Sequence, residues 1–159
     1  MKKLNQSLSG LLAAVVLASA ATGVHAQVSP EDQIKFRKAG YSYMSWNMGR
    51  IKAQVIDGTV RYDQQQVASA ANVIAAIANS GMGALFGPGT EKNVGDQVTR
   101  VDPSLFENFP DVAQLSSNFV SAADNLAAQA ATGDQAAIRT AFGQVGQACK
   151  ACHDKYRLD

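Results

Sequence analysis

The sequence predicts an all-α fold, an antiparallel four-helix bundle. Four segments repeat apolar residues at the three- and four-residue spacing of one helix face, and little of the chain shows the alternation of a strand. Mostly short turns separate these segments, which favours antiparallel neighbours. Alanine is abundant, and it both favours helix formation and allows helices to approach closely. No internal repeat or second domain interrupts this pattern.

The first predicted helix begins at Ser29 and Pro30, a capping hydroxyl followed by a residue suited to the first helical position. It runs to about Ile56 and stops at Asp57 and Gly58. Its inward stripe consists of Ile34, Arg37, Tyr41, Met44, Met48, Ile51 and Val55. This stripe predicts the face that the first helix turns toward the bundle interior.

The second predicted helix extends from near Asp63 to Asn79, and a long connection follows it. Its buried face is formed by Val67, Ala70, Ala71, Ile74, Ile77 and Ala78. The connection from Gly81 to about Pro110 is rich in glycine and proline and is the least regular part of the chain. It has no Gly-Lys-Ser/Thr sequence of a phosphate loop. We therefore interpret it as the best candidate for a crossover that wraps a cofactor.

The third predicted helix runs from about Asp111 to Thr132 and ends at Gly133, and the fourth begins at Asp134. The apolar spacing of three and four residues is kept in the third helix by Val112, Leu115, Phe119, Ala122 and Leu126. In the fourth helix it is kept by Ile138, Phe142, Val145, Cys149, Cys152 and Tyr156. Both cysteines therefore share the seam of the core residues and should face the bundle interior.

The N-terminus has the pattern of a secretory signal peptide, predicted over residues 1–26. Lys2 and Lys3 precede a short apolar stretch at 11–21, and Val24-His25-Ala26 supplies a small-x-small cleavage site. An uncleaved signal anchor is the alternative. Removing 26 of the 159 residues leaves 133, a normal length for the single bundle domain predicted over residues 27–159. We expect a periplasmic or exported protein with no membrane insertion after cleavage.

Signal removal changes the charge and the histidine inventory. The formal net charge falls from +1 to −1 because Lys2 and Lys3 are lost, so no basic excess predicts binding to nucleic acid. Of the two histidines, His25 leaves with the signal and His153 remains. A second histidine ligand to any metal from the mature chain is thereby excluded.

The run Cys149-Lys150-Ala151-Cys152-His153 predicts covalent attachment of one haem c per chain. Two thiols three residues apart lie on one side of a helix and can bond both vinyl groups of a porphyrin, and His153 then serves as axial ligand of the iron. A disulfide, a thioredoxin-like pair and a zinc site are the alternatives. They are disfavoured by the tiny loop, the missing β-α-β context and the lack of further ligands.

Several runs of the chain resemble the cytochrome c′ family over essentially the whole mature sequence. They are the haem motif close to the C-terminus, the run from Gly40 to Arg50, the loop run Phe86-Gly87-Pro88-Gly89-Thr90, and Ala141-Phe142-Gly143. The resemblance implies a homodimeric periplasmic protein with five-coordinate, high-spin haem that binds NO and CO at a crowded distal face. The roles it suggests are NO sequestration and electron transfer.

The resemblance also implies roles for three further residues. A bulky side chain of the first helix covers the iron in this family, and Tyr41 occupies that position; an ordinary core tyrosine is the alternative. Tyrosinate ligation is discounted because ionising a group of pKa about 10 in an apolar pocket is costly. Arg37, costly to bury alone, is predicted to contact a haem propionate. Arg157, four residues after His153, is predicted to lie on the proximal side, or else to complement the helix dipole.

A methionine ligand is the rival for the sixth position of the iron. Met44, Met48 and Met82 remain in the mature chain, and a thioether ligand would make a low-spin electron-transfer cytochrome with no open ligand site. Methionines on a helical stripe are more often core filling. A catalytic haem enzyme such as a peroxidase is not predicted, because the mature chain has no distal histidine for acid–base chemistry.

A second apolar face on the first helix predicts contact between subunits. Phe36, Tyr43 and Trp46 lie away from the inward stripe, although a helix packed in one bundle needs only one apolar face. Isolated exposed aromatic residues are the alternative. We expect a homodimer; the redox partner cannot be identified from the sequence.

Overall fold

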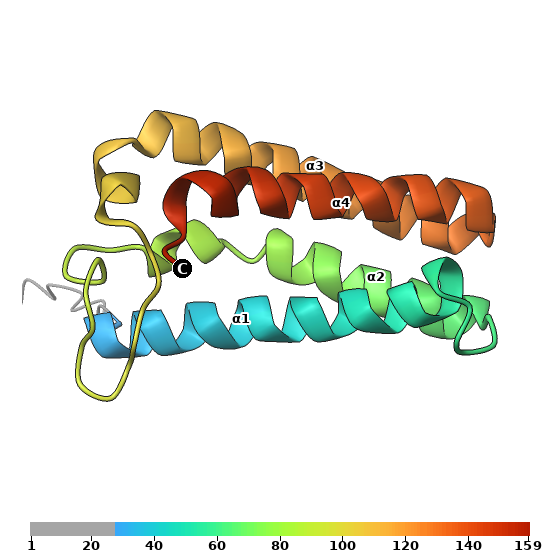
Figure 1. Ribbon diagram of the computed structural model, residues 1–159, viewed down its shortest axis with the longest axis horizontal. Coiled ribbons are helices and arrows are strands. Elements are labelled where there is room, and N and C mark those ends of the chain that lie inside the picture. The colour runs from blue at the N-terminus through green and yellow to red at the C-terminus, as the bar shows by residue number, and fades with distance from the viewer. Residues whose placement is uncertain (1–27) are drawn as a thin grey trace, which may run out of the picture.

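The computed structural model describes residues 28–159, and four long helices run through this range. They are α1 (Pro30–Ile51), α2 (Gln64–Ala78), α3 (Phe109–Thr132) and α4 (Gln135–Tyr156). Figure 1 shows them as an elongated antiparallel bundle, which confirms the predicted fold class. The predicted signal peptide and its cleavage site lie outside the described residues. They and the domain boundary derived from them stay predictions.

The helix boundaries follow the sequence pattern with two differences. The predicted first helix does reach Ile56, but its last turn is a π-helix, Lys52–Ile56. The carbonyl of Val55 in this turn accepts a 2.7 Å hydrogen bond from Nε of Arg139 in α4. Ile51 and Val55 are four residues apart and both are buried, as in an ordinary α-helix, so the sequence pattern does not reveal the wider turn. The second difference is that α3 begins at Phe109, two residues earlier than predicted.

The turn between α3 and α4 is fixed by local chemistry. Gly133 ends α3 with φ of 78°, a left-handed conformation that favours glycine. A Cβ atom here would also lie 2.8 Å from the Gln64 side chain. Asp134 then caps α4, its carboxylate accepting a 2.9 Å hydrogen bond from the amide of Ala136. This short turn makes α3 and α4 antiparallel neighbours.

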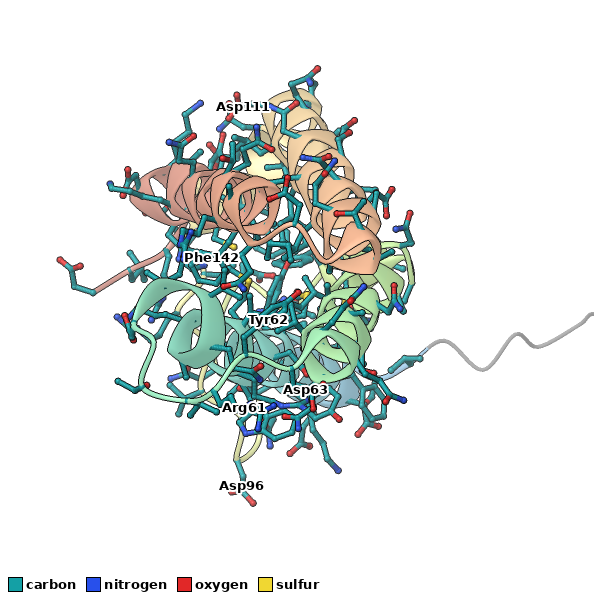
Figure 2. All side chains as sticks on the ribbon, turned by 90° about the vertical axis from the view of Figure 1, so that its right-hand side faces the viewer. Arg61, Tyr62, Asp63, Asp96, Asp111 and Phe142 are labelled. Atoms are coloured by element: carbon teal, nitrogen blue, oxygen red, sulfur yellow. The ribbon has the colours of Figure 1, made fainter. Side chains whose placement is uncertain are left out.

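The core lies between consecutive helices, since α1 packs on α2, α2 on α3 and α3 on α4. Among its fully buried side chains are Ile51, Val67, Ile74, Leu126, Ile138 and Val145. Figure 2 views the bundle from the end that carries the π-helix, with Tyr62 and Phe142 directed between the helices. The Tyr62 hydroxyl donates a 3.2 Å hydrogen bond to the carbonyl of Gly133. That contact ties the α1–α2 connection to the α3–α4 turn.

The two ends of the bundle differ. At the π-helix end, α4 contacts the last turn of the first helix, whereas α1 itself has few contacts with α4 among the described residues. At the other end the crossover, residues 79–108, runs between the two helix pairs and lies beside the C-terminus (Figure 1). It contains two short 3₁₀ helices, Met82–Leu85 and Pro103–Glu107. No helix within residues 28–159 is long and apolar enough to cross a membrane.

Candidate haem site

The candidate site begins with two cysteines and a histidine in the last two turns of α4. Cys149 and Cys152 are free thiols, both half-buried, and Cys149 packs against the hydrophobic core. Burial raises the pKa of both thiols, so they are protonated near neutral pH. His153 is the next residue and lies one turn after Cys149 on the same helix.

Tyr41 of α1 is electrostatically coupled to the two thiols of α4. Its pKa is raised to about 12, chiefly by burial and then by the proximity of Cys152 and Cys149. Electrostatic influence of this kind requires the phenol and the thiols to lie near one another. The structure therefore brings Tyr41 of the first helix, α1, near the two cysteines of the last helix, α4. A thioether cannot ionise at any pH, so after haem attachment burial remains as the main cause of the raised Tyr41 pKa.

The surface of Tyr41 is 44% exposed, although it belongs to the predicted inward stripe of α1. Its neighbours on that stripe, Arg37 and Met44, are buried. Enough protein surrounds the Tyr41 phenol to raise its pKa, yet nearly half of the residue's surface stays accessible. Tyr41 is thus less enclosed than the stripe predicts, because α1 and α4 are not closely packed on each other.

Arg37, one turn before Tyr41, is 4% exposed and binds the crossover. Its guanidinium donates four hydrogen bonds, two from Nη1 to the Leu85 carbonyl (3.1 Å) and Thr90 Oγ1 (2.8 Å). Nη2 donates to the Thr90 carbonyl (2.7 Å) and to Thr99 Oγ1 (2.7 Å). Burial lowers the pKa of Arg37, and no carboxylate pairs with it among the described residues.

These bonds bear on the predicted contact between Arg37 and a haem propionate. A guanidinium has five N–H donors, and the crossover takes four of those of Arg37. The Nε–H group is the donor left for a propionate if the crossover keeps its position. The propionate contact stays a prediction, and binding of the crossover is a role that the sequence did not reveal.

Arg157 follows α4 in an extended conformation, with φ of −122°. Its amide donates a 3.2 Å hydrogen bond to the carbonyl of His153. Burial lowers the pKa of His153, and the charge of Arg157 lowers it further. The charge of Arg157 therefore reaches the imidazole, and its role on the proximal side of a haem stays a prediction.

Sequence reasoning missed an acidic residue beside the haem motif. Asp111, in the first turn of α3, accepts hydrogen bonds from the Tyr156 hydroxyl (2.7 Å) and from Nζ of Lys155 (3.0 Å). These bonds lower the pKa of Asp111, whose charge in turn raises the pKa of Cys152. Because 45 residues separate Asp111 from Tyr156, no local sequence signal predicts the pair.

The methionines that rival Tyr41 are engaged in packing. Met44 belongs to the buried core, and Met48 packs against it. Met82 lies against Gly40, where a Cβ atom would be 3.1 Å from the Met82 sulfur. The absence of a side chain at Gly40 therefore makes room for Met82 beside α1.

The donor set fits a c-type haem. Two protonated thiols lie in neighbouring turns of one helix, an imidazole follows them, and an uncharged phenol approaches from the opposite helix. Thiols and imidazole are the groups that form the thioether links and the axial bond of such a haem. The sparse contact between α1 and α4 is compatible with a flat group between these helices.

Comparison with known proteins agrees with this assignment. The protein-family model described as Cytochrome C' matches residues 32–157. Cytochrome c′ of Allochromatium vinosum is 57% identical over 157 residues, which span 99% of this chain and 99% of that protein. The crystal structure of cytochrome c′ from Thermochromatium tepidum is 57% identical, with a TM-score of 0.80 over 84% of this chain and 99% of that chain. A nitric oxide complex of a cytochrome c′ variant from Alcaligenes xylosoxidans is 33% identical, with a TM-score of 0.72 over 82% of this chain and 97% of that chain.

Proposed function

The chain belongs to the cytochrome c′ family, and from this we propose that it is a periplasmic haem protein whose five-coordinate, high-spin iron binds NO and CO. Membership of the family implies a c-type haem. The iron of that haem supplies both the binding of diatomic gases and one-electron transfer. The residues of this chain decide which molecules reach it and how its axial ligand is held.

Attachment is assigned to α4. Cys149 and Cys152 form the two thioether links to one haem per chain, and His153 is the axial ligand. The support is the position of both thiols in neighbouring turns, where they are half-buried and influence the pKa of Tyr41. The predicted proximal role of Arg157 rests on its influence on the pKa of His153. A cation beside the imidazole opposes imidazolate character and keeps this ligand a moderate donor.

The observation that carries the gas-binding proposal is the proximity of Tyr41 to the haem-attachment cysteines, which both raise its pKa. A pKa of about 12 keeps the phenol protonated near neutral pH, so it does not act as an anionic ligand. Placed on the distal side of the haem, this neutral ring would admit small diatomic molecules and would refuse larger ligands by its bulk. Variants of the Alcaligenes xylosoxidans cytochrome c′ have been solved with CO and with NO bound, which supports the same chemistry here.

The test is the absorption spectrum of the dithionite-reduced holoprotein before and after addition of CO. A high-spin ferrous spectrum that changes on adding CO is expected from an iron with an open site. A low-spin spectrum unaffected by CO would defeat the proposal and favour the alternative, a His/Met electron-transfer cytochrome. In that case Met44→Leu, Met48→Leu and Met82→Leu identify the ligand, because only the ligand variant becomes high-spin.

Assembly as a homodimer is part of the proposal. The aromatic face, defined here as Phe36, Tyr43 and Trp46, is exposed on α1. The rings of Tyr43 and Trp46 are stacked at 5.4 Å, and the guanidinium of Arg50 lies 4.9 Å from the Trp46 ring centroid. A solved cytochrome c′ 60% identical to this chain is described as having an unusual ligand-controlled dimer dissociation. An exposed apolar surface of this kind is suited to burial against a second copy.

The remaining parts of the proposal concern location and partners. The predicted signal peptide at 1–26 directs the chain to the periplasm, where a redox partner not yet identified exchanges electrons with the haem. We expect no enzymatic turnover, since electron transfer and reversible gas binding need no acid–base residue. Cell fractionation tests the location, and mass spectrometry of the purified protein detects both cleavage after Ala26 and the mass of one covalent haem.

A further inference from the structure

Thr99 in the crossover joins two parts of the molecule through one oxygen atom. Its Oγ1 accepts a 2.7 Å hydrogen bond from Nη2 of Arg37 and a 3.2 Å hydrogen bond from the amide of Val101. The amide of Thr99 itself donates to Oδ1 of Asn93 at 2.9 Å, which fixes the loop around it. Thr99 therefore holds Val101 in a defined position relative to α1.

Val101 in turn forms an isolated antiparallel bridge with Arg157. Two backbone hydrogen bonds flank this bridge, from the amide of Asp102 to the Tyr156 carbonyl (2.9 Å) and from the amide of Leu158 to the Arg100 carbonyl (2.8 Å). The segment that carries Arg157 is thus paired with the crossover rather than left as a free end. Its extended backbone, which ends α4, follows from this pairing.

The two ends of this connection lie next to two residues of the candidate haem site, Tyr41 and His153. Arg37 lies one turn from Tyr41 on α1, and the two side chains influence each other electrostatically. Arg157 lies beside His153, because its amide donates a 3.2 Å hydrogen bond to the His153 carbonyl. A continuous path of hydrogen bonds through Thr99 and the bridge therefore runs from the Tyr41 side to the His153 side.

We propose that Thr99 is a positioning residue that fixes Arg157 beside the proximal histidine and couples its position to Arg37 on the distal side. The inference rests on the proposed roles of His153 and Tyr41 in haem binding. Outer hydrogen bonds of this kind orient axial ligands and tune the metal. One loop then holds both sides of the site, so a disturbance of the crossover reaches the axial ligand as well as the distal side.

The test uses Thr99→Val in the holoprotein, which removes the acceptor and keeps the branched shape of the side chain. The first measurement is hydrogen exchange by mass spectrometry of the fragments that contain Asp102 and Leu158. Loss of one hydrogen bond should speed exchange of these amides by about tenfold. The second measurement is the iron–histidine stretching frequency of the ferrous protein by resonance Raman, which should shift relative to the unchanged protein.

Two variants control the experiment. Thr140→Val removes a hydroxyl whose 3.1 Å bond goes to Ala136 on the exposed side of α4, and it should change neither measurement. Thr99→Ser keeps the accepting oxygen and should remain close to the parent protein in both. If Thr99→Val does not fold, Leu158→Pro removes the amide donor at the far end of the bridge and should shift the same Raman frequency.

The outcomes separate this inference from the proposed function. Unchanged exchange in Thr99→Val, or an equal change in Thr140→Val, overturns the role of Thr99. Faster exchange with an unshifted iron–histidine frequency also overturns it, because the loop then holds the chain end without affecting the proximal ligand. A low-spin parent protein whose spectrum does not change with CO would defeat only the gas-binding proposal. The hydrogen-exchange comparison would still decide whether Thr99 holds the bridge between Val101 and Arg157.

Discussion

The hydroxyl of Tyr156 donates a 2.7 Å hydrogen bond to the carboxylate of Asp111. Tyr156 is buried near the end of α4, and Asp111 belongs to the first turn of α3, where a negative charge is favoured by the helix dipole. Lys155 adds a 3.0 Å ion pair to the same carboxylate. The last turn of α4, which contains the proposed haem ligand, is therefore fastened to α3 by side chains as well as by packing.

Removing this hydrogen bond should destabilise the bundle. In Tyr156→Phe the ring remains while the donor to Asp111 is lost, so the melting temperature of the holoprotein should fall by about 3–6 °C. Thermal unfolding followed by far-UV circular dichroism measures the change. Tyr43→Phe is the matched control, because it removes the hydroxyl of an exposed tyrosine. Equal melting temperatures for Tyr156→Phe and the parent protein would show that the bond contributes nothing to stability.

The same pair predicts how stability depends on pH. The pKa of Tyr156 is raised to about 12, chiefly by its bond to Asp111, so the native state favours the protonated phenol. The stabilisation should be complete below about pH 10, the ordinary pKa of tyrosine, and should disappear as the pH rises toward 12. Urea midpoints of the parent protein and Tyr156→Phe should therefore converge over this interval. A gap that stays constant from pH 9 to about 12 contradicts the assignment.

The acidic limb has the opposite sign. Hydrogen bonds from Tyr156 and Lys155 hold the pKa of Asp111 below its usual value of 3.8. The stabilisation by this carboxylate should be present above that value and be lost as the pH falls through the lowered native pKa. Asp111→Asn should consequently differ from the parent protein at neutral pH and approach it in acid. A difference in urea midpoint that persists below the native pKa rules out ionisation of Asp111 as the cause.

Most of the fold was predictable because it depends on local chemistry. Periodic apolar residues located all four helices, and Ser29, Asp63 and Asp134 marked starts at which the structure shows capping hydrogen bonds. Gly133 marked the sharp turn before α4. The π-helical turn was not predictable. Arg139, which donates a hydrogen bond to the Val55 carbonyl in this turn, comes from a distant helix and leaves no periodic signal.

The site was predictable to the extent that its residues are close in sequence. One motif contains Cys149, Cys152 and His153, and helix periodicity predicts that both cysteines face the core. Tyr41 came from the family resemblance, and the structure adds its proximity to both thiols. The partners Thr99 and Asp111 were missed because each acts across a tertiary contact that the sequence does not encode locally.

The aromatic face should contribute most of the dimer affinity. Trp46 lies on this face, stacked on Tyr43 and covered by Arg50, and such anchors commonly account for 2 kcal/mol or more of binding. Trp46→Ser should therefore weaken dimerisation by about 30-fold, measured by sedimentation equilibrium of the holoprotein. Val98→Ser, an exposed apolar residue of the crossover, is the control and should leave the dissociation constant unchanged. If both variants behave alike, the interface lies elsewhere.

Arg37 should be irreplaceable by another cation. Lysine keeps the charge but cannot reproduce four hydrogen bonds in two directions or the stacking of the guanidinium, 4.7 Å from the Phe86 ring centroid. Arg37→Lys should lower the free energy of unfolding by about 2–4 kcal/mol in urea titrations. Arg37→Leu should lower it further and also shift the haem redox potential if the propionate contact exists. Arg61→Lys, at an exposed arginine, serves as control. An unchanged stability and redox potential in Arg37→Leu would exclude both the crossover-binding role and the propionate contact.

The final prediction concerns the distal side chain. If Tyr41 excludes ligands by its bulk, Tyr41→Ala removes a steric cost of about 1–3 kcal/mol and should raise the CO association rate of the ferrous protein about 5- to 150-fold. Tyr41→Phe keeps the ring, so its association rate should stay within about threefold of the parent protein, while faster release would reveal a hydrogen bond from the hydroxyl. Stopped-flow mixing and flash photolysis measure both rates.

Tyr43→Ala is the matched control for this series, because Tyr43 lies two residues further along α1 on the aromatic face. It should leave CO binding unchanged, since Tyr43 is exposed and its ring is stacked on Trp46. An unchanged association rate in Tyr41→Ala would mean that another group covers the iron, and Met82, packed beside Gly40, is one candidate. The spin state of the ferrous Tyr41→Ala protein decides between the two, because a methionine free to bind makes the iron low-spin whereas an open site leaves it high-spin.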